Sequence, residues 1–298
     1  MLKIILSTFG STTSILIKLG SSGGFTLTVM LLGSGATGAV PTTLIFGIFS
    51  HPDAAAHTVL GLHSLQHRGQ EAAGIVSFDG RIFHSHRALG LVGDNFSSKA
   101  TMNRLLGSSA IGHVRYSTSG DSVIRNVQPL FAEFKFGGFA VAHNGNLTNA
   151  YKLRRELINK GCLFQSTSDS ETIIHLVATS EFGDVIDRLI DAINNIEGAF
   201  SLVALSQKKL IGIRDPFGVR PLVLGKLGNS FILASETCAL DIIGAKFLRE
   251  VENGEIVLIE NNELTSLKPF SPKKVRPCVF EYIYFARPDS LIDNKTAY

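Results

Sequence analysis

The sequence predicts an α+β fold in which antiparallel sheets are stacked between layers of helices. Short apolar runs outnumber helical stretches after residue 43, and hairpin turns join several of them. The clearest turn is Asp79-Gly80, because Asp-Gly supplies the positive φ values that a tight turn needs. Sheets joined in this way need helices over their outer faces.

The individual elements follow from runs and breakers. A buried strand is predicted over residues 44–49, and the next helix begins at Pro52 and Asp53 and continues to about Gln66, since proline and an acidic residue both suit a first turn. Further strands are predicted at 73–78, 81–85, 110–116, 136–142, 199–205, 209–214, 222–227, 230–234, 254–259, 263–267 and in the aromatic run 280–285, and further helices at 147–160, 170–180 and 182–194.

Composition indicates an ordinary globular protein. The 298 residues are 45% hydrophobic and 18% charged, which is enough to bury a core. The 28 basic and 25 acidic residues are scattered along the chain, so no nucleic-acid or membrane-surface patch is predicted. Cys162, Cys238 and Cys278 lie far apart, which argues against a zinc finger and a disulfide scaffold and favours a reducing, cytoplasmic setting.

Residues 1–42 differ from everything after them. Lys3 and Lys18 are their only charged residues, and glycine, serine, threonine and aliphatic residues fill the rest. A membrane anchor is disfavoured because the apolar run 25–40 is shorter than the roughly 20 residues that cross a bilayer. We expect an atypical leader that is disordered, removable or an artefact of the reading frame.

Two polar motifs contain arginines near the ends of predicted elements, where loops on a rigid scaffold often carry function. In the segment 65–71, Gly69 can end a helix and Arg68 can be a solvated charge, or both can belong to a site. In the segment 112–121, Arg115 can clamp a carboxylate with its planar guanidinium, or it can simply end a surface strand.

Two further motifs contain an amide and a carboxylate. Asn144 beside Gly145 offers a side-chain amide and a backbone N–H to an oxyanion, although Asn-Gly by itself favours a tight turn. The segment 166–171 has the pattern of a helix N-cap, which is its favoured interpretation, but Asp169 could instead receive a substrate ammonium group.

Taken together and in this order, the motifs resemble one family. The segments 47–53, 65–74, 114–118, 126–130, 143–146, 214–222 and 281–290 look like the amidotransferase domain of the amidophosphoribosyltransferases. The resemblance covers about residues 45–298. Other amidotransferases share the Arg-Gly, His-Asn-Gly and acidic elements, but they do not resemble this chain at residues 66–71 or 284–290.

The resemblance implies a fold and a reaction. The fold is the four-layer αββα sandwich of the N-terminal nucleophile hydrolases. Members hydrolyse glutamine with an N-terminal cysteine whose own α-amine is the base, and they pass the ammonia to phosphoribosyl pyrophosphate in a second domain. The product is the 5-phosphoribosylamine of de novo purine biosynthesis.

The resemblance also implies roles for residues of this chain. Arg115 would hold the α-carboxylate of glutamine and Asp169 its α-ammonium group, while Asn144 and the N–H of Gly145 would form the oxyanion hole.

Further roles concern the rim and the support of the pocket. The loop 116–128, including the substrate-binding Thr118, would close over the pocket as a lid, and Arg68 and His143 would support it.

One departure from the family concerns the nucleophile. The family begins with Cys-Gly-Val-Phe-Gly-Ile, whereas this chain has Thr43 and Leu44 at the first two positions. A threonine hydroxyl can be an N-terminal nucleophile when its amine is free, but it gives no thiolate at neutral pH. The alternative to a glutaminase is therefore an inactive fragment or a glutamine-binding regulatory module.

The other departure concerns the end of the chain. We expect a leader at 1–42, the amidotransferase domain at 43–270, and at 271–298 a connector and the start of a truncated phosphoribosyltransferase domain, which would bind magnesium and phosphoribosyl pyrophosphate. No cofactor or metal is expected in this chain itself; Cys278 matches a position that ligates an iron–sulfur cluster in some relatives, but a lone cysteine is not a cluster site. The expected partner is glutamine, with neither nucleic acid nor membrane, and the full-length family is expected to form homo-oligomers.

Overall fold

A computed structural model gives the structure of residues 3–9, 12–18, 43–116, 123–292 and 295–296. The chain divides into two compact units, one ending at Val40 and one beginning at Pro41. In the smaller unit, β1 (Lys3–Phe9) pairs antiparallel with β2 (Thr12–Lys18). No strand was predicted in this leader, but the isoleucine and threonine residues in both segments favour strands.

Within the described residues, the strands of the larger unit form two large antiparallel sheets and one short hairpin near residue 292. In the order of pairing, the seven-stranded sheet contains β13 (Lys246–Glu250), β11 (Val223–Leu227), β12 (Ser230–Ala234), β3 (Leu44–Phe49), β6 (Ser109–Arg115), β4 (Ala72–Phe78) and β5 (Phe83–Leu89). The six-stranded sheet contains β15 (Glu263–Leu267), β14 (Ile256–Glu260), β10 (Leu210–Arg214), β9 (Gly198–Ser206), β8 (Gly137–Leu147) and β7 (Leu130–Phe134).

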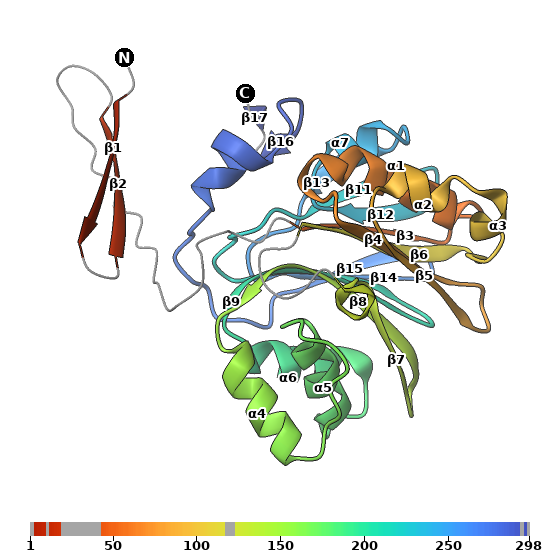
Figure 1. The fold of residues 1–298 in the computed structure, drawn as a ribbon. Helices are drawn as coiled ribbons and strands as arrows, with labels where there is room; N and C mark the ends of the chain where they lie inside the picture. The colour runs from red at the N-terminus through yellow and green to blue at the C-terminus, as the bar shows by residue number, and fades with distance from the viewer. Residues whose placement is uncertain (1–2, 10–11, 19–42, 117–122, 293–294, 297–298) are drawn as a thin grey trace. The chain divides into compact units, whose positions relative to one another are not determined.

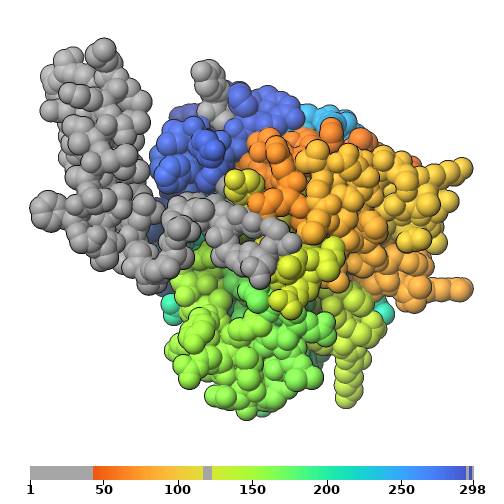
Figure 2. Space-filling model, in the orientation of Figure 1, coloured from red at the N-terminus to blue at the C-terminus, as the bar shows by residue number. Residues whose placement is uncertain are grey.

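Helices cover the outer faces of both sheets (Figure 1). The seven-stranded sheet carries α1 (Ala54–Leu65), α2 (Val92–Phe96), α3 (Lys99–Met102) and α7 (Cys238–Asp241). The six-stranded sheet carries α4 (Ala150–Asn159), α5 (Glu171–Thr179) and α6 (Val185–Asn195). Figure 2 shows the α1–α3 layer, in orange and yellow, apart from the α4–α6 layer, in green. The four-layer αββα sandwich that the resemblance implied is confirmed.

Strand β3 shows how the alternation of side chains builds these layers. Leu44, Phe46 and Ile48 pack with the outer helices, while Ile45 and Phe49 pack between the two sheets. Successive side chains of a strand point to opposite faces, so one strand fills two cores. A near-continuous apolar run was therefore the correct signal for a strand buried on both faces.

Most predicted elements are confirmed within a few residues, and the differences have local causes. The second strand of the first hairpin begins at Phe83 rather than 81, because the Asp79 carboxylate accepts hydrogen bonds from the amides of Arg81 and Ile82 and extends the turn. Strand β8 continues to Leu147, where a helix was predicted to begin, and the helix begins at Ala150. Strands β7 and β13 and the short helices α2, α3 and α7 were not predicted.

The prediction of a strand at 280–285 is wrong. Residues Glu281–Phe285 form a helical turn, and a two-residue hairpin of β16 (Leu291–Ile292) and β17 (Lys295–Thr296) follows. The Glu281 side chain is buried and ion-paired, which fixes this segment against the sandwich instead of leaving it to pair with a strand. Short 3₁₀ turns also occur at Gln66–Arg68 and Ile124–Asn126.

Among the described residues, no helix combines the length and the apolar character that crossing a membrane requires.

The contact between the two sheets predicts a sensitive position. A Cβ atom added to Gly47 would lie 2.7 Å from Cγ1 of Val203 on the facing sheet and 3.0 Å from Cδ1 of Leu210. We expect Gly47→Ala to lower the free energy of unfolding by about 1–3 kcal/mol, the usual cost of overpacking a core. Urea denaturation measures the change.

The matched control is Gly93→Ala, because a Cβ atom at Gly93 in α2 would meet no atom within 4 Å. Alanine is favoured over glycine in helices, so we expect this variant to be as stable as the parent or slightly more stable. If Gly47→Ala were as stable as Gly93→Ala, the close contact of the two sheets would be contradicted.

Candidate active site

A pocket lies where one end of β3 meets β8 of the facing sheet and the segment before α5. Its lining includes Thr43, Arg115, Gln128, His143, Gly145 and Asp169. The pocket is thus built from both sheets and from one outer layer. Its side chains are polar, although the sheets that carry them are apolar.

Thr43 lies directly before β3, at the end of the central strand of the seven-stranded sheet. Its Oγ1 atom lies 3.3 Å from the carbonyl oxygen of His143 and 3.4 Å from Oδ1 of Asn144, so its single hydrogen can be donated to either. The residue is buried, at 8% exposure. Leu44 stands where the family that the chain resembles has glycine. Its side chain packs with the outer helices, so it does not fill the pocket.

Asn144 and Gly145 belong to β8, and the interpretation of Asn-Gly as a tight turn is wrong. Asn144 pairs with Ser201 of β9, and it is fully buried. Its Nδ2 donor has no hydrogen-bond partner among the residues that the structure describes. A buried amide without a partner costs free energy, so this donor is available for a ligand oxygen.

Gly145 is required by its surroundings. A Cβ atom at this position would lie 2.0 Å from the carbonyl oxygen of Ala199 on the neighbouring strand. Any side chain would push β8 away from β9 and displace Asn144 with it. The glycine therefore keeps the amide donor and the backbone of the pocket in place.

His143 fixes the floor of the pocket through its neighbours. Its backbone N–H donates to Oε1 of Gln128 at 2.8 Å, and its Nδ1 lies 2.9 Å from Oγ of Ser170. Nε2 of Gln128 also donates to Oγ of Ser170, at 3.1 Å. Burial lowers the pKa of His143 and outweighs the attraction of Asp169 3.9 Å away, so the ring is neutral at neutral pH.

Arg115 and Asp169 bring opposite charges to the pocket. Arg115 ends β6 and is only 8% exposed, so its interpretation as a surface strand end is wrong. Burial lowers the pKa of its guanidinium, while Glu71 and Asp169 counteract part of this shift. Arginine nevertheless stays protonated in proteins.

Asp169 is not the helix cap that its sequence pattern favoured. Its Oδ2 atom accepts the backbone N–H of Leu147 at 2.9 Å, and its Oδ1 atom accepts Oγ–H of Ser170 at 3.3 Å. The N-cap residue of α5 is Ser170, and its side chain makes no capping hydrogen bond. The carboxylate is therefore held at the pocket by β8 and keeps lone pairs for a cation.

The predicted lid lies partly outside the described residues. Thr118 and the rest of 117–122 fall there, so the position of Thr118 is not described. The far end of the loop is anchored, because Asn126 exchanges hydrogen bonds of 2.9 Å with the N–H and hydroxyl of Thr167. This anchor joins the loop to the segment that carries Asp169.

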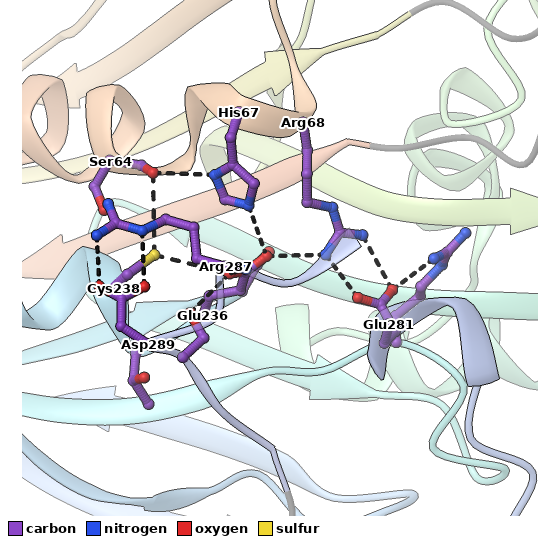
Figure 3. Close-up of polar contacts among 12 residues, drawn as sticks. Ser64, His67, Arg68, Glu236, Cys238, Glu281, Arg287 and Asp289 are labelled. Atoms are coloured by element: carbon purple, nitrogen blue, oxygen red, sulfur yellow. Dashed lines mark hydrogen bonds and ion pairs between the residues drawn. The ribbon is translucent and has the colours of Figure 1, made fainter. Parts of the chain in front are cut away.

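Arg68 lies in a buried charge cluster rather than in solvent (Figure 3). Its guanidinium donates to both carboxylate oxygens of Glu281, at 2.6 and 3.0 Å, and to Oε1 of Glu236, at 3.0 Å. Arg220 binds the same Glu281 at 2.6 Å. The interpretation of Arg68 as a solvated charge is wrong. Arg68 is absent from the pocket lining, and its neighbour Gly69 lies against the backbone of Arg115.

Glu236 is the second acid of this cluster. Burial alone would raise its pKa, but the hydrogen bond from His67 and the charge of Arg68 outweigh burial and hold the pKa at about 2. Ser290 and the backbone N–H of Arg287 donate to the same carboxylate. The cluster thus fixes residues 281–290 against the 3₁₀ turn that follows α1 and the segment that follows β12.

Several of these residues were not singled out from the sequence. Gln128 and Ser170 had a weak signal, since each is a polar residue next to an apolar or helical stretch. Glu281 had a stronger one, because a lone carboxylate within an aromatic run indicates a buried ion pair. Cys278 lies in a separate surface pocket beside Arg214 and Glu281.

His113 was also missed as a residue of interest. It lies on β6 between the sheets, fully buried and close to the backbone of His143 on the facing sheet. Burial, the charge of Arg115 and the neighbouring His143 lower its pKa to about 3. The ring is therefore neutral at neutral pH, and it packs as a core side chain two residues before Arg115.

Comparisons with known proteins agree with this architecture. Residues 113–241 match the family of glutamine amidotransferase domains. The amidophosphoribosyltransferase of Rhizobium etli is 56% identical over 259 residues, which cover 85% of this chain and 52% of that protein. The amidophosphoribosyltransferase of Bacillus subtilis is 44% identical over 252 residues, which cover 84% and 52%.

A solved structure shows the same relation. The glutamine phosphoribosylpyrophosphate amidotransferase of B. subtilis, solved with ADP and GMP, has a TM-score of 0.80 and 42% identity over 85% of this chain and 55% of that one. The chain spans about half the length of the curated relatives it matches.

The neutral His113 makes a prediction about pH. Its pKa is depressed from 6.5 to about 3 in the folded state, so the unfolded state binds more protons between these values and stability falls as pH falls below 6.5. From pH 6.5 to about pH 5 this one group should cost about 2 kcal/mol. Urea denaturation at both pH values measures the loss.

We expect His113→Phe to remove this part of the pH dependence, whatever it does to stability at one pH. His63→Phe, which replaces an exposed histidine of α1, should keep the parent's pH dependence. Equal pH dependence in the parent and His113→Phe would show that His113 is not held neutral by the fold.

Proposed function

We propose that this chain, a relative of the amidophosphoribosyltransferases over their glutamine amidotransferase region, binds L-glutamine and hydrolyses its side-chain amide once Thr43 is the first residue. One observation carries the proposal: the guanidinium of Arg115 and the carboxylate of Asp169 line the same small pocket as the Thr43 hydroxyl. An amino acid zwitterion complements this pair of charges.

The two charges orient the substrate. The planar guanidinium of Arg115 is suited to a bidentate contact with the α-carboxylate. Asp169 is held by Leu147 and Ser170 and still has lone pairs for the α-ammonium group. With both ends of the backbone fixed, the side-chain amide is directed toward Thr43, and proximity lowers the barrier to attack.

The chemistry then follows from Thr43 and its neighbours. Oγ1 of Thr43 attacks the amide carbon, and the α-amine of a first-residue Thr43 takes its proton. Nδ2 of Asn144 and the N–H of Gly145 stabilise the negative charge on the amide oxygen. The C–N bond breaks, the protonated nitrogen leaves as ammonia, and water releases glutamate from the ester on Thr43.

A second function is supported by one feature of this chain. In the 298-residue chain the nitrogen of Thr43 is in a peptide bond with Thr42, so the base is masked. Cleavage between these residues would supply it. A chain that is not cleaved, or whose hydroxyl is too weak a nucleophile, would bind glutamine without turnover and act as a regulatory module.

The wider setting is proposed from the relatives. The ammonia would react with phosphoribosyl pyrophosphate to give 5-phosphoribosylamine in purine biosynthesis. This reaction would take place at the magnesium-binding site of a second, phosphoribosyltransferase domain. We also propose a cytoplasmic location, supported by the free thiols of Cys162, Cys238 and Cys278. A homo-oligomer is proposed for the full-length enzyme.

The binding step makes a first prediction. Arg115→Met should weaken glutamine binding, measured by calorimetry on the uncleaved chain, by at least about thirtyfold, because losing one partner of a charged contact costs about 2–5 kcal/mol. Arg155→Met is the matched control, because Arg155 is exposed on α4 and lies outside both the pocket lining and the loop 116–128. Equal affinities in the two variants would contradict the proposed role of Arg115.

The chemical step makes a second prediction. In chains that begin at residue 43, Thr43→Ala should release no glutamate, Thr43→Cys should release it faster than threonine, and Asn144→Ala should be slower by about 10²–10³-fold. Coupled detection of glutamate measures the rates. Glutamine binding without release from the threonine and cysteine chains would favour the regulatory module instead.

A further inference from the structure

A second group of polar side chains lies at the other end of β3, at the start of α1. One ligand atom each from His51, Asp53 and His57 lies within 4.8 Å of the other two. In the residues open to description, no other group of three histidine, cysteine or acidic side chains is gathered so closely. The strand between this group and Thr43 has six residues, which is roughly 20 Å.

The carboxylate of Asp53 is not used by the helix that it precedes. Asp53 is the N-cap residue of α1, yet its side chain accepts no hydrogen bond from the helix amides. An aspartate at this position usually makes that bond, which is worth about 1 kcal/mol. Its side chain is close to two imidazoles instead, so its oxygens are available to a ligand.

The two histidines offer nitrogen donors with different present partners. Nδ1 of His57 is buried and has no hydrogen-bond partner among the described residues. Nδ1 of His51 accepts the backbone N–H of Asp53 at 3.1 Å. Coordination by His51 would exchange this hydrogen bond for a metal bond, whereas His57 would gain a partner that it lacks.

We propose that His51, Asp53 and His57 bind a Zn²⁺ ion. Two imidazole nitrogens and one carboxylate oxygen are a donor set that zinc accepts, with a fourth position left for water. Ligand atoms of a tetrahedral zinc site lie about 3.4 Å apart, given bonds of about 2.1 Å. Small rotations of the Asp53 and His51 side chains, which are exposed and half-buried, are enough to close the group.

The geometry gives the ion a structural role. The backbone of this segment already turns tightly, because the N–H of Ala54 donates to the carbonyl of His51 and that of His57 to the carbonyl of Asp53. A bound ion would join the connection that follows β3 to the first turns of α1. It would stabilise this connection, and it is independent of glutamine binding at the other end of the strand.

The test is calorimetric titration of the 298-residue chain with Zn²⁺. We expect one saturable site whose affinity falls at least about tenfold in both His57→Gln and Asp53→Asn, since even outer partners of a metal site are worth 10–100-fold. His63→Gln, on an exposed face of the same helix, should bind as the parent does. Zn²⁺ should also raise the parent's Tm by more than it raises that of Asp53→Asn.

Co²⁺ gives an independent readout, because its visible spectrum reports ligand number and geometry. The parent should show bands that Asp53→Asn loses. Because Asp53 is exposed, this variant tests the site even if His57→Gln fails to fold. Equal Zn²⁺ affinity in the parent and Asp53→Asn, or no saturable binding to the parent, would overturn the proposal.

Discussion

Where β3 crosses the facing sheet, position 47 has no room for a side chain, and the same is true of Gly212 against Leu233. These close contacts set how the two sheets pack, and the packing sets the site. Thr43 precedes β3 of one sheet and Asn144 belongs to β8 of the other, yet Oγ1 of Thr43 lies 3.4 Å from Oδ1 of Asn144. A change in the spacing of the sheets would therefore move the Thr43 hydroxyl relative to the Asn144 amide, even with every residue of the pocket unchanged.

The buried ion cluster extends this constraint to the last part of the chain. Glu281 binds Arg68 and Arg220, and both arginines have backbone neighbours at the pocket. Gly69 lies against Arg115, and the carbonyl of Arg220 accepts the hydroxyl of Ser201, which pairs with Asn144. Buried ion pairs of this kind add little net stability, but removing one partner is costly, so they fix positions.

The sequence predicted the sandwich well because its signals were local. Strands buried on both faces read as short apolar runs, and 44–49 and 230–234 have the predicted bounds. The site was predicted less well from the residues themselves. Asn-Gly favours a turn and a serine–aspartate run favours a cap, and only pairing across the sheet makes Asn144 part of β8 and directs Asp169 to the pocket.

What the sequence did not predict depends on contacts between distant residues. Arg68 and Glu281 are 213 positions apart, so neither a solvated charge nor an aromatic strand was an unreasonable interpretation. The grouping of His51 and His57 was not predicted either. They are six residues apart, and they come close together only because α1 begins between them. Order of motifs along the chain was more informative than any one of them.

A crystal structure of the 298-residue chain with L-glutamine is the decisive measurement of how Arg115 and Asp169 orient glutamine toward Thr43, because it needs no turnover. We expect the α-carboxylate on Arg115, the α-ammonium group on Asp169, and the side-chain amide carbon facing Oγ1 of Thr43 with its oxygen toward Nδ2 of Asn144. Glutamine bound elsewhere, or in this pocket with its side-chain amide on Arg115, would contradict the proposed orientation of glutamine by Arg115 and Asp169.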